Sequence, residues 1–303
     1  MSNISQFFAG SRKKNRRIFH GSVGVTTVTW QVPPGVTEVE VHCWGAGGSG
    51  GGGGGGYVTH VFPVTPSDSL LITAGASPGG TSSVSVPTQS PISPISATGG
   101  TFNYAGVGGT GSYTIAPGIS TARTFSASGG TGFYGGGAAG SPFGPGGNGG
   151  NGSYGGGGGG IGGPGGISDV PNFYGGGGGS LGPGFVRTTG NPAGGLGKNG
   201  YKSSTVSATP VNAATVENAS GDDDWFYVDE ILGSGGSGYA VNGGAGAGGA
   251  ARFTEVPTSA VGHGGILGGG GGPNSGTAGA GGLAGGGGYP GGIAGAGLVI
   301  LYW

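Results

Sequence analysis

The sequence predicts an all-β fold: a β-sandwich with an inserted bundle of glycine-rich threefold helices and almost no α-helix. Glycine makes up 89 of the 303 residues, and much of it lies in blocks with a three-residue period. The non-glycine parts alternate apolar and polar residues, as strands do. No stretch combines helical periodicity with helix caps.

The glycine blocks carry a side chain at every third position in two stretches. These positions are Pro145, Asn148 and Asn151, then Ile161, Pro164 and Ile167. A period of three fits the left-handed polyproline II type helix, which rises about 3.1 Å per residue. Such a helix makes no internal hydrogen bonds, so its peptide groups need partners in neighbouring segments, and glycine permits the close approach. We therefore expect a packed bundle of polyglycine II helices, mainly in residues 45–56, 129–179 and 233–297.

A flexible linker is the main alternative for a chain of this composition. The array is interrupted by apolar side chains where a linker would carry serine or charge. They are Tyr154, Ile161, Phe173, Tyr174 and Leu181. Uninterrupted glycine in residues 155–160 and 175–179 breaks the phase of collagen.

The chain begins with a segment, residues 1–22, that combines aromatic and basic side chains. We expect it to anchor the protein to another protein through Phe7, Phe8, Arg12, Lys13, Lys14, Arg16 and Arg17. A solvated terminus is an equally open interpretation. A nuclear-localisation or RNA-binding arm finds no support in the acidic, glycine-rich remainder.

Residues 23–303 form the second predicted unit, with strands mainly in residues 23–98 and 298–303. Val39, Val41 and Cys43 alternate with polar neighbours, which is typical of a half-buried strand. Further strands are expected at residues 57–64, 70–74 and 81–86. The final apolar run, from Leu298 to Trp303, fits a strand buried on both faces. In the economical arrangement the first and last strands meet, and residues 185–231 form a loop insertion.

Composition excludes several classes of function. Five of the ten basic residues lie in residues 12–17, which leaves five to oppose eleven acidic residues, so we do not expect a nucleic-acid partner. Cys43 is the only cysteine, which forbids an internal disulfide, and we interpret it as a small buried apolar residue. No apolar run approaches the roughly 20 residues of a membrane span, so we expect no membrane insertion.

Charge and aromatic side chains concentrate in residues 222–230. Carboxylates beside aromatic residues could form a glycosidase site or bind Ca²⁺. An exposed loop without any ligand is a further alternative. We favour recognition of a carbohydrate or an outer surface, with Tyr201, Asp223, Trp225, Phe226 and Tyr227 as candidate receptor-binding residues. The histidines are scattered, and no glycine motif opens a helix after a strand. We predict no catalytic, cofactor-binding or metal-binding residue.

The order of strands and glycine blocks resembles a known domain. The resemblance is carried by residues 30–37, 41–48, 51–57, 70–75, 80–83 and 297–302, which read WQVPPGVT, VHCWGAGG, GGGGGGY, LLITAG, GTSS and GLVILY. Together they look like the glycine-rich domain of bacteriophage tail-fibre proteins. They also resemble the glycine-rich extracellular module of anaplastic lymphoma kinase receptors. The glycine blocks are similar to those of adhesins at the tips of T-even-like tail fibres.

This resemblance, which covers residues 25–303, implies a jelly-roll-like sandwich that carries polyglycine helices. It implies a virion tail fibre or adhesin, made in the host cytoplasm, that attaches to the host without catalysis or a cofactor. Expected partners are other tail or fibre proteins and a host glycan or outer-membrane protein, and a homo-oligomer such as a trimer is open. The alternatives are a polysaccharide depolymerase and a purely structural virion component. In contrast to the family, we expect no separate attachment domain in this sequence beyond its first 20 residues.

Overall fold

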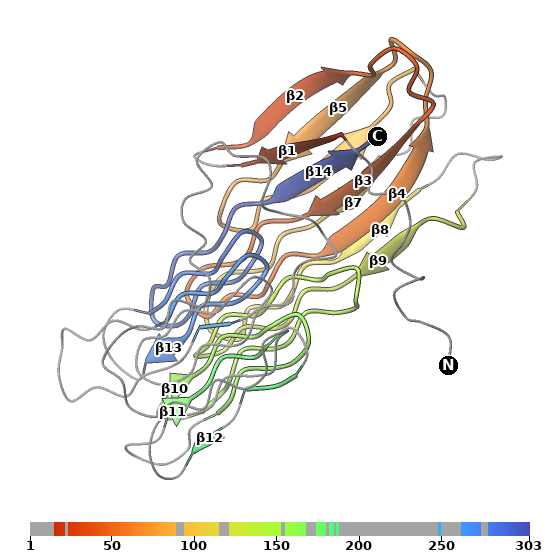
Figure 1. Ribbon diagram of the computed structural model, residues 1–303. Helices are drawn as coiled ribbons and strands as arrows, with labels where there is room; N and C mark the ends of the chain where they lie inside the picture. Colours follow the sequence, from red (N-terminus) through yellow and green to blue (C-terminus); the bar gives the residue numbers. More distant parts are fainter. Residues whose placement is uncertain are drawn as a thin grey trace, which may run out of the picture.

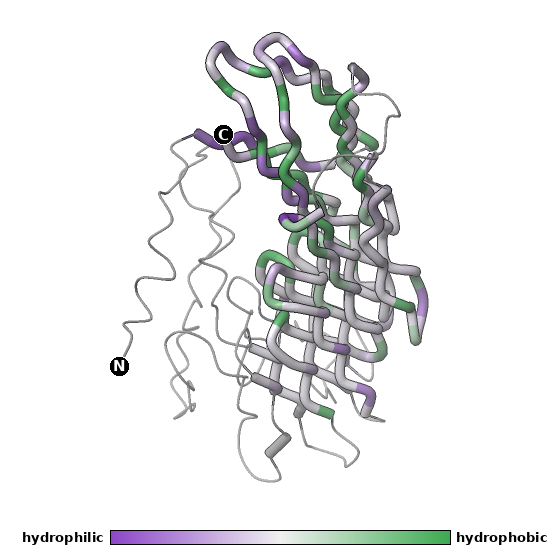
Figure 2. The backbone as a smooth tube through the Cα atoms, turned by 90° about the vertical axis from the view of Figure 1, so that its right-hand side faces the viewer, coloured by the Kyte–Doolittle hydropathy of each residue, from purple (hydrophilic) through white to green (hydrophobic). Residues whose placement is uncertain are grey.

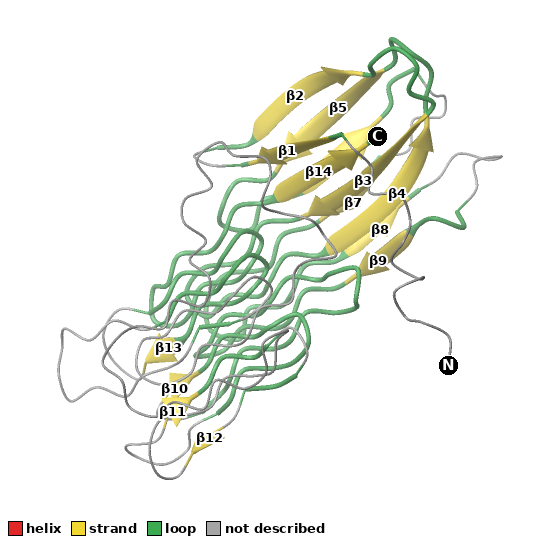
Figure 3. Cartoon of the chain, in the orientation of Figure 1, coloured by secondary structure: helices red, strands yellow, loops and turns green. Residues whose placement is uncertain are grey.

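The computed structural model is all-β, with antiparallel sheets and no helix among the residues that it describes (Figure 3). It describes residues 15–21, 24–88, 94–114, 121–152, 155–167, 174–179, 182–184, 186–187, 248–249, 262–273 and 278–303. The predicted fold class is confirmed at this level.

The first sheet joins strands from both ends of the chain. Its five strands, in spatial order, are β1 (Arg16–His20), β14 (Leu298–Tyr302), β3 (Glu38–Trp44), β4 (Tyr57–Pro63) and β9 (Phe125–Ala127). Ile300, in the middle of β14, pairs with Ile18 on one side and His42 on the other. The prediction that the first and last strands meet is confirmed.

Strand β1 corrects the sequence prediction at the N-terminus. Residues 1–22 were expected to lie outside the sandwich, yet Arg16–His20 pair antiparallel with β14. The basic residues obscured the strand pattern, because Arg16 and Arg17 precede only two apolar residues, Ile18 and Phe19. Charged residues are common on a strand at the edge of a sheet, which is the position of β1.

The second sheet is also antiparallel and five-stranded. It consists of β2 (Thr26–Gln31), β5 (Ser69–Ala74), β6 (Ser82–Ser85), β7 (Ile95–Ala97) and β8 (Gly111–Tyr113). Strands β4, β5 and β6 lie where the apolar alternation predicted them. Strands β8 and β9 were not predicted, because three residues are too few to display a period.

The two sheets pack face to face around one apolar core. Val39, Val41 and Cys43 of β3 point into it and are fully buried. Leu70 and Ile72 of β5 face them from the second sheet, also fully buried. The alternation read from β3 therefore assigns its inner face correctly, and Glu38, Glu40 and His42 lie on the outer face.

The glycine segments run on from one end of the sandwich as a stack of extended chains (Figure 1). In Figure 2 this stack is almost uniformly pale, because glycine is neither strongly polar nor strongly apolar. Two short ladders lie within it. One pairs β10 (Gly155–Gly156) with β13 (Gly272–Pro273), and the other pairs β11 (Tyr174–Gly175) with β12 (Val186–Arg187). We call this stack the glycine bundle.

Hydrogen bonds in the glycine bundle rotate among neighbours with a period of three. Six consecutive N–H groups, in residues 135–140, donate to three other segments, at N···O distances of 2.8–3.1 Å. Gly135 and Ala138 donate to Gly150 and Gly147 of one segment. Gly136 and Ala139 donate to Gly270 and Leu267 of a second segment, and Gly137 and Gly140 donate to Gly52 and Gly55 of a third. Every third residue therefore bonds the same neighbour. A flat strand has only two lateral neighbours, so this pattern differs from a β-ladder.

Close approach of backbones explains the glycine content. A Cβ atom on Gly136 would lie 2.0 Å from the carbonyl oxygen of Gly286, and one on Gly149 would lie 1.8 Å from that of Gly135. No side chain fits at such distances. Residues 98–110, which were not predicted as part of the bundle, also belong to it, since Gly53 and Gly56 donate to Thr101 and Thr98.

A second apolar cluster joins the glycine bundle to the outer face of the first sheet. Trp44, Tyr57, Leu298 and Ile300 supply the sheet side, and all four are almost completely buried. The bundle side contributes Ala139, Ile161, Ile266, Leu267 and Ala284. Ile161, one of the apolar residues that argued against a linker, thus belongs to a buried core.

Candidate functional site

An exposed group of aromatic side chains sits on turns of the glycine bundle. We call Tyr104, Phe133, Tyr134 and Tyr289 the aromatic cluster. Their ring centroids lie 5.4–6.2 Å apart, with interplanar angles of 70–81°. Tyr104, Tyr134 and Tyr289 each contact the other two edge to face, an arrangement that aromatic rings favour. The rings come from three turns far apart in the sequence.

Gly51 is the residue on which these three turns converge. A Cβ atom there would lie 2.3 Å from the carbonyl oxygen of Phe133, 3.0 Å from the Cβ of Tyr289 and 3.3 Å from the Cα of Tyr104. Its φ of 80° is also one that glycine adopts readily and other residues avoid. Glycine at this position therefore allows the cluster to assemble.

Backbone hydrogen bonds hold the turns in place. The N–H groups of Asn103 and Gly106 donate to the carbonyl oxygens of Ser49 and Gly51, at 2.9 and 3.2 Å. The N–H of Tyr289 donates to the carbonyl oxygen of Tyr134 at 2.7 Å. The main chain around the cluster is thus tied to the glycine bundle on more than one side.

The turn that carries Tyr104 adopts an unusual backbone conformation. Asn103 and Ala105, on either side of it, have φ angles of 74° and 61°. Asparagine tolerates the left-handed region, whereas alanine adopts it at a cost of about 1 kcal/mol or more. Such backbone strain is found disproportionately at functional sites, and here it sets the position of an exposed ring.

The cluster presents apolar surface and neutral polar groups. Tyr104 is 44% exposed and Tyr289 is 38% exposed, while Phe133 and Tyr134 are half-buried. The Tyr104 hydroxyl donates a hydrogen bond to Oδ1 of Asn151. No member of the cluster is charged, and neither is Asn151. This surface can stack against an apolar face of a ligand and can exchange hydrogen bonds with neutral polar groups.

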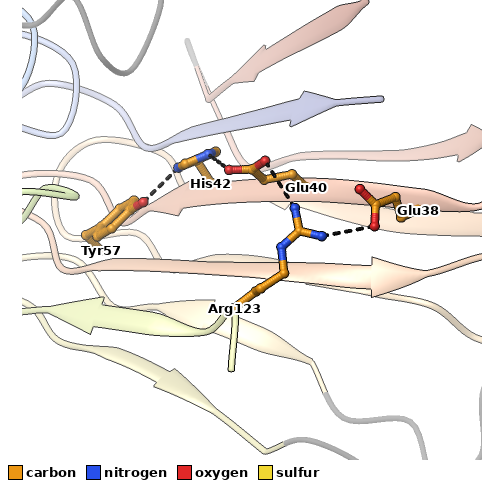
Figure 4. A network of polar contacts seen from close by, with 5 residues as sticks. All are labelled: Glu38, Glu40, His42, Tyr57 and Arg123. Atoms are coloured by element: carbon orange, nitrogen blue, oxygen red, sulfur yellow. Dashed lines mark hydrogen bonds and ion pairs between the residues drawn. The ribbon is translucent and has the colours of Figure 1, made fainter. Parts of the chain in front are cut away.

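A polar network crosses the outer face of the first sheet near the glycine bundle (Figure 4). Arg123 forms an ion pair of 2.9 Å with Glu38 and lies 3.9 Å from Glu40. His42 bonds Glu40 through Nε2 at 3.0 Å and Tyr57 through Nδ1 at 2.7 Å. The network therefore runs from solvent at Glu38 to the buried ring of Tyr57.

We interpret this network as structural, because its buried groups bond one another. A carboxylate can only accept, so Nε2–H of His42 donates to Glu40, and in the neutral ring Nδ1 accepts from the Tyr57 hydroxyl. Burial raises the pKa of that hydroxyl, so it remains a donor. The buried polar groups of His42 and Tyr57 thus have partners within the network, and both side chains are too enclosed to meet a ligand.

Cys43 and His60 are both buried in the inner face of the sandwich. Burial raises the pKa of the Cys43 thiol, which suits the predicted role as a small apolar residue. Burial, and secondarily the positive charge of Arg123, lowers the pKa of His60. His60 bonds the Thr124 hydroxyl through Nδ1 at 2.7 Å, and its Nε2 has no hydrogen-bond partner in the described part of the chain.

The residues predicted to bind a receptor or to anchor the chain have different outcomes. Tyr201, Asp223, Trp225, Phe226 and Tyr227 lie outside the described residues, as do Phe7, Phe8, Arg12, Lys13 and Lys14. Arg16 and Arg17 lie in β1, opposite Tyr302 and Leu301 of β14. The sequence reasoning missed the aromatic cluster. In the sequence the cluster is visible only as tyrosine and phenylalanine residues at turns within glycine blocks. No local sequence feature indicates that these turns meet.

Among the residues that the structure describes, no three histidine, cysteine, aspartate or glutamate side chains come together as metal ligands. No helix long and apolar enough to cross a membrane occurs in those parts of the chain.

No protein-family model matches this chain, and no curated protein sequence matches it either.

Proposed function

We propose that this protein is a bacteriophage tail-fibre or adhesin protein that attaches the virion to the host surface by non-catalytic binding. The observation that carries the proposal is a laterally bonded glycine bundle that displays exposed aromatic rings on its turns. The order of strands and glycine blocks resembles the glycine-rich domain of tail-fibre proteins, which supports the same role.

We also propose that the glycine segments are polyglycine II helices carried on a jelly-roll-like sandwich. The rotation of donors among three neighbours in residues 135–140 supports the threefold helix, because successive peptide groups of that helix point about 120° apart. Lateral backbone bonds of this kind resist bending in every direction. A bundle so bonded makes a stiff platform for the turns that connect its segments, and the exposed side chains of such turns are free to vary.

In this proposal the virion is the site of action and the host cytoplasm the site of synthesis. Residues 1–14 dock on another tail or fibre protein or on a sister chain, with Phe7, Phe8, Arg12, Lys13 and Lys14 as contacts. A homo-oligomer, such as a trimer, would suit a fibre. A host glycan or outer-membrane protein is the external partner, and Tyr201, Trp225, Phe226 and Tyr227 are candidate contacts to it.

Adsorption to cells tests the proposal. Fluorescently labelled protein is incubated with a panel of Gram-negative strains, and the fraction that pellets with the cells is measured. We expect saturable binding to at least one strain, reduced by Trp225→Ala and Tyr227→Ala. Phe143→Ala is the control, since Phe143 is an aromatic residue that is 54% exposed on another turn.

Two results would overturn the proposal. Failure to bind any strain would favour a purely structural virion component. Release of sugars from surface polysaccharide, abolished by Asp223→Asn, would favour the depolymerase, because glycoside cleavage requires a carboxylate acid or base.

A further inference from the structure

We propose that the aromatic cluster is a carbohydrate-binding site that takes neutral hexose polymers. The inference rests on the proposed function as a surface-binding protein, and it names the site and the chemical class of the ligand. Tyr104 and Tyr289 supply the exposed rings, Phe133 and Tyr134 support them, and Asn151 adds an amide.

Ring geometry is the first argument. In an edge-to-face pair the edge of one ring covers only part of a face of the other, so rings packed in this way can keep part of their surface exposed. Tyr104 and Tyr289 are 44% and 38% exposed even though they contact each other and Tyr134. A pyranose ring has a face lined by C–H groups that packs flat against such a surface, while its hydroxyl groups point outward to the rim.

The polar groups and the absence of charge point to the same ligand. Tyr104 donates to Oδ1 of Asn151, which leaves the amide N–H groups of Asn151 beside the rings as donors for sugar hydroxyls. The cluster and Asn151 contain no charged side chain, so nothing in them would attract a phosphate, sulfate or carboxylate. A neutral sugar is the ligand that needs both flat apolar surface and uncharged hydrogen-bonding groups.

Preorganisation is the third argument. The main chain beneath the rings is held by bonds from Asn103 to Ser49, from Gly106 to Gly51 and from Tyr289 to Tyr134. A tyrosine ring has only two side-chain torsions to order, and here it already packs against its neighbours. A ligand would therefore bind without much loss of conformational entropy in the protein.

Affinity electrophoresis tests this inference. The full chain is run in native gels that contain dextran, mannan or galactan, and the loss of mobility with polymer concentration gives the Kd. Dextran sulfate serves as the anionic comparison. We expect at least one neutral polymer to retard the wild-type protein. Tyr104→Ala and Tyr289→Ala should each weaken that binding about tenfold, the effect expected for truncating a central tyrosine.

Two more variants separate binding from folding. Phe143→Ala removes an exposed ring outside the cluster and should bind as the wild type does. Tyr104→Leu keeps an apolar side chain in the cluster but removes the flat face and the hydroxyl, so it should fold with an unchanged melting temperature and still lose binding.

Several results would overturn the inference. They are retardation by no neutral polymer, retardation by dextran sulfate alone, and equal binding by wild type and both alanine variants. A second copy of the chain is the other possible occupant of the cluster, and sedimentation velocity tests it. If the wild type self-associates and Tyr104→Ala does not, the cluster is an interface between copies of the chain. Cell adsorption that persists while every neutral polymer fails would sink this inference and leave the proposed function standing.

Discussion

The indole nitrogen of Trp44 donates a hydrogen bond of 2.9 Å to the carbonyl oxygen of Gly140, a residue 96 positions further along the chain. Trp44 is the last residue of β3, and Gly140 belongs to a glycine segment. The bond therefore joins the sandwich to the glycine bundle at a fully buried position. Glycine segments have few side chains that could hold them against the sandwich. A side-chain bond such as the one from Trp44 therefore helps to fix the position of the glycine bundle on the first sheet.

Replacing Trp44 by phenylalanine should lower the free energy of unfolding by about 1–3 kcal/mol, because it removes the donor to a buried carbonyl. Urea unfolding followed by circular dichroism measures the change. Trp30→Phe is the matched control, since Trp30 is only partly buried and contacts Trp303 through its ring. Equal losses in the two variants would contradict a special role for the bond to Gly140.

Gly149 and Gly162 occupy equivalent places in the three-residue period but should differ in their tolerance of alanine. A Cβ on Gly149 would lie 1.8 Å from a backbone oxygen, whereas Gly162 is exposed. We expect Gly149→Ala to cost at least about 3 kcal/mol and to reduce soluble yield, because backbone cannot move aside as a side chain can. Gly162→Ala should stay within about 0.5 kcal/mol of wild type. Thermal melting and soluble yield are the measurements, and wild-type values for both variants would favour a linker.

His60 should make the fold less stable in acid. Burial lowers the pKa of His60 in the native state below its ordinary value of 6.5. At pH values below 6.5 the unfolded chain therefore binds a proton that the native protein does not, so the free energy of unfolding falls as the pH is lowered. Well above pH 6.5 neither state is protonated at His60, and this contribution is constant.

The measurement compares urea unfolding of wild type and His60→Leu between pH 7.5 and pH 5. We expect the wild type to lose more stability over this range than the variant, which has no group to titrate at position 60. The hypothesis is rejected if the two proteins show the same pH dependence.

Truncation at the N-terminus should have two separable effects. Deleting residues 1–14 leaves β1 in place, so the protein should fold normally but no longer join particles if those residues dock it. Deleting residues 1–20 also removes β1 and uncovers one edge of β14, whose sequence is LVILY. An uncovered apolar strand edge pairs with other chains, so this protein should aggregate. Light scattering and recovery in purified particles are the readouts, and normal incorporation of the shorter deletion would refute the docking role.

Local pattern accounts for much of what was predicted correctly. The alternation in residues 38–44 identifies a strand with Val39, Val41 and Cys43 inside, because side chains of a strand alternate between faces. The final apolar run identifies a strand buried on both faces, since Val299 and Leu301 lie in the core between the sheets and Leu298 and Ile300 lie in the second apolar cluster. The spacing of Pro145, Asn148 and Asn151 indicates that the glycines between them face neighbouring segments without room for side chains. At Gly149 the backbone of Gly135 does come that close.

Tertiary structure alone decided which glycine segments are neighbours. Backbone hydrogen bonds carry no sequence code, because any glycine N–H can bond any glycine carbonyl. The partners are chosen instead by sparse side-chain anchors such as Ile161 and Leu267, which are buried in one cluster with Trp44 of the first sheet. The convergence at Gly51 of the turns that carry Tyr104, Phe133 and Tyr289 depends on that choice. The sequence by itself therefore determined the kinds of segment this chain contains, and packing between distant segments determined the site.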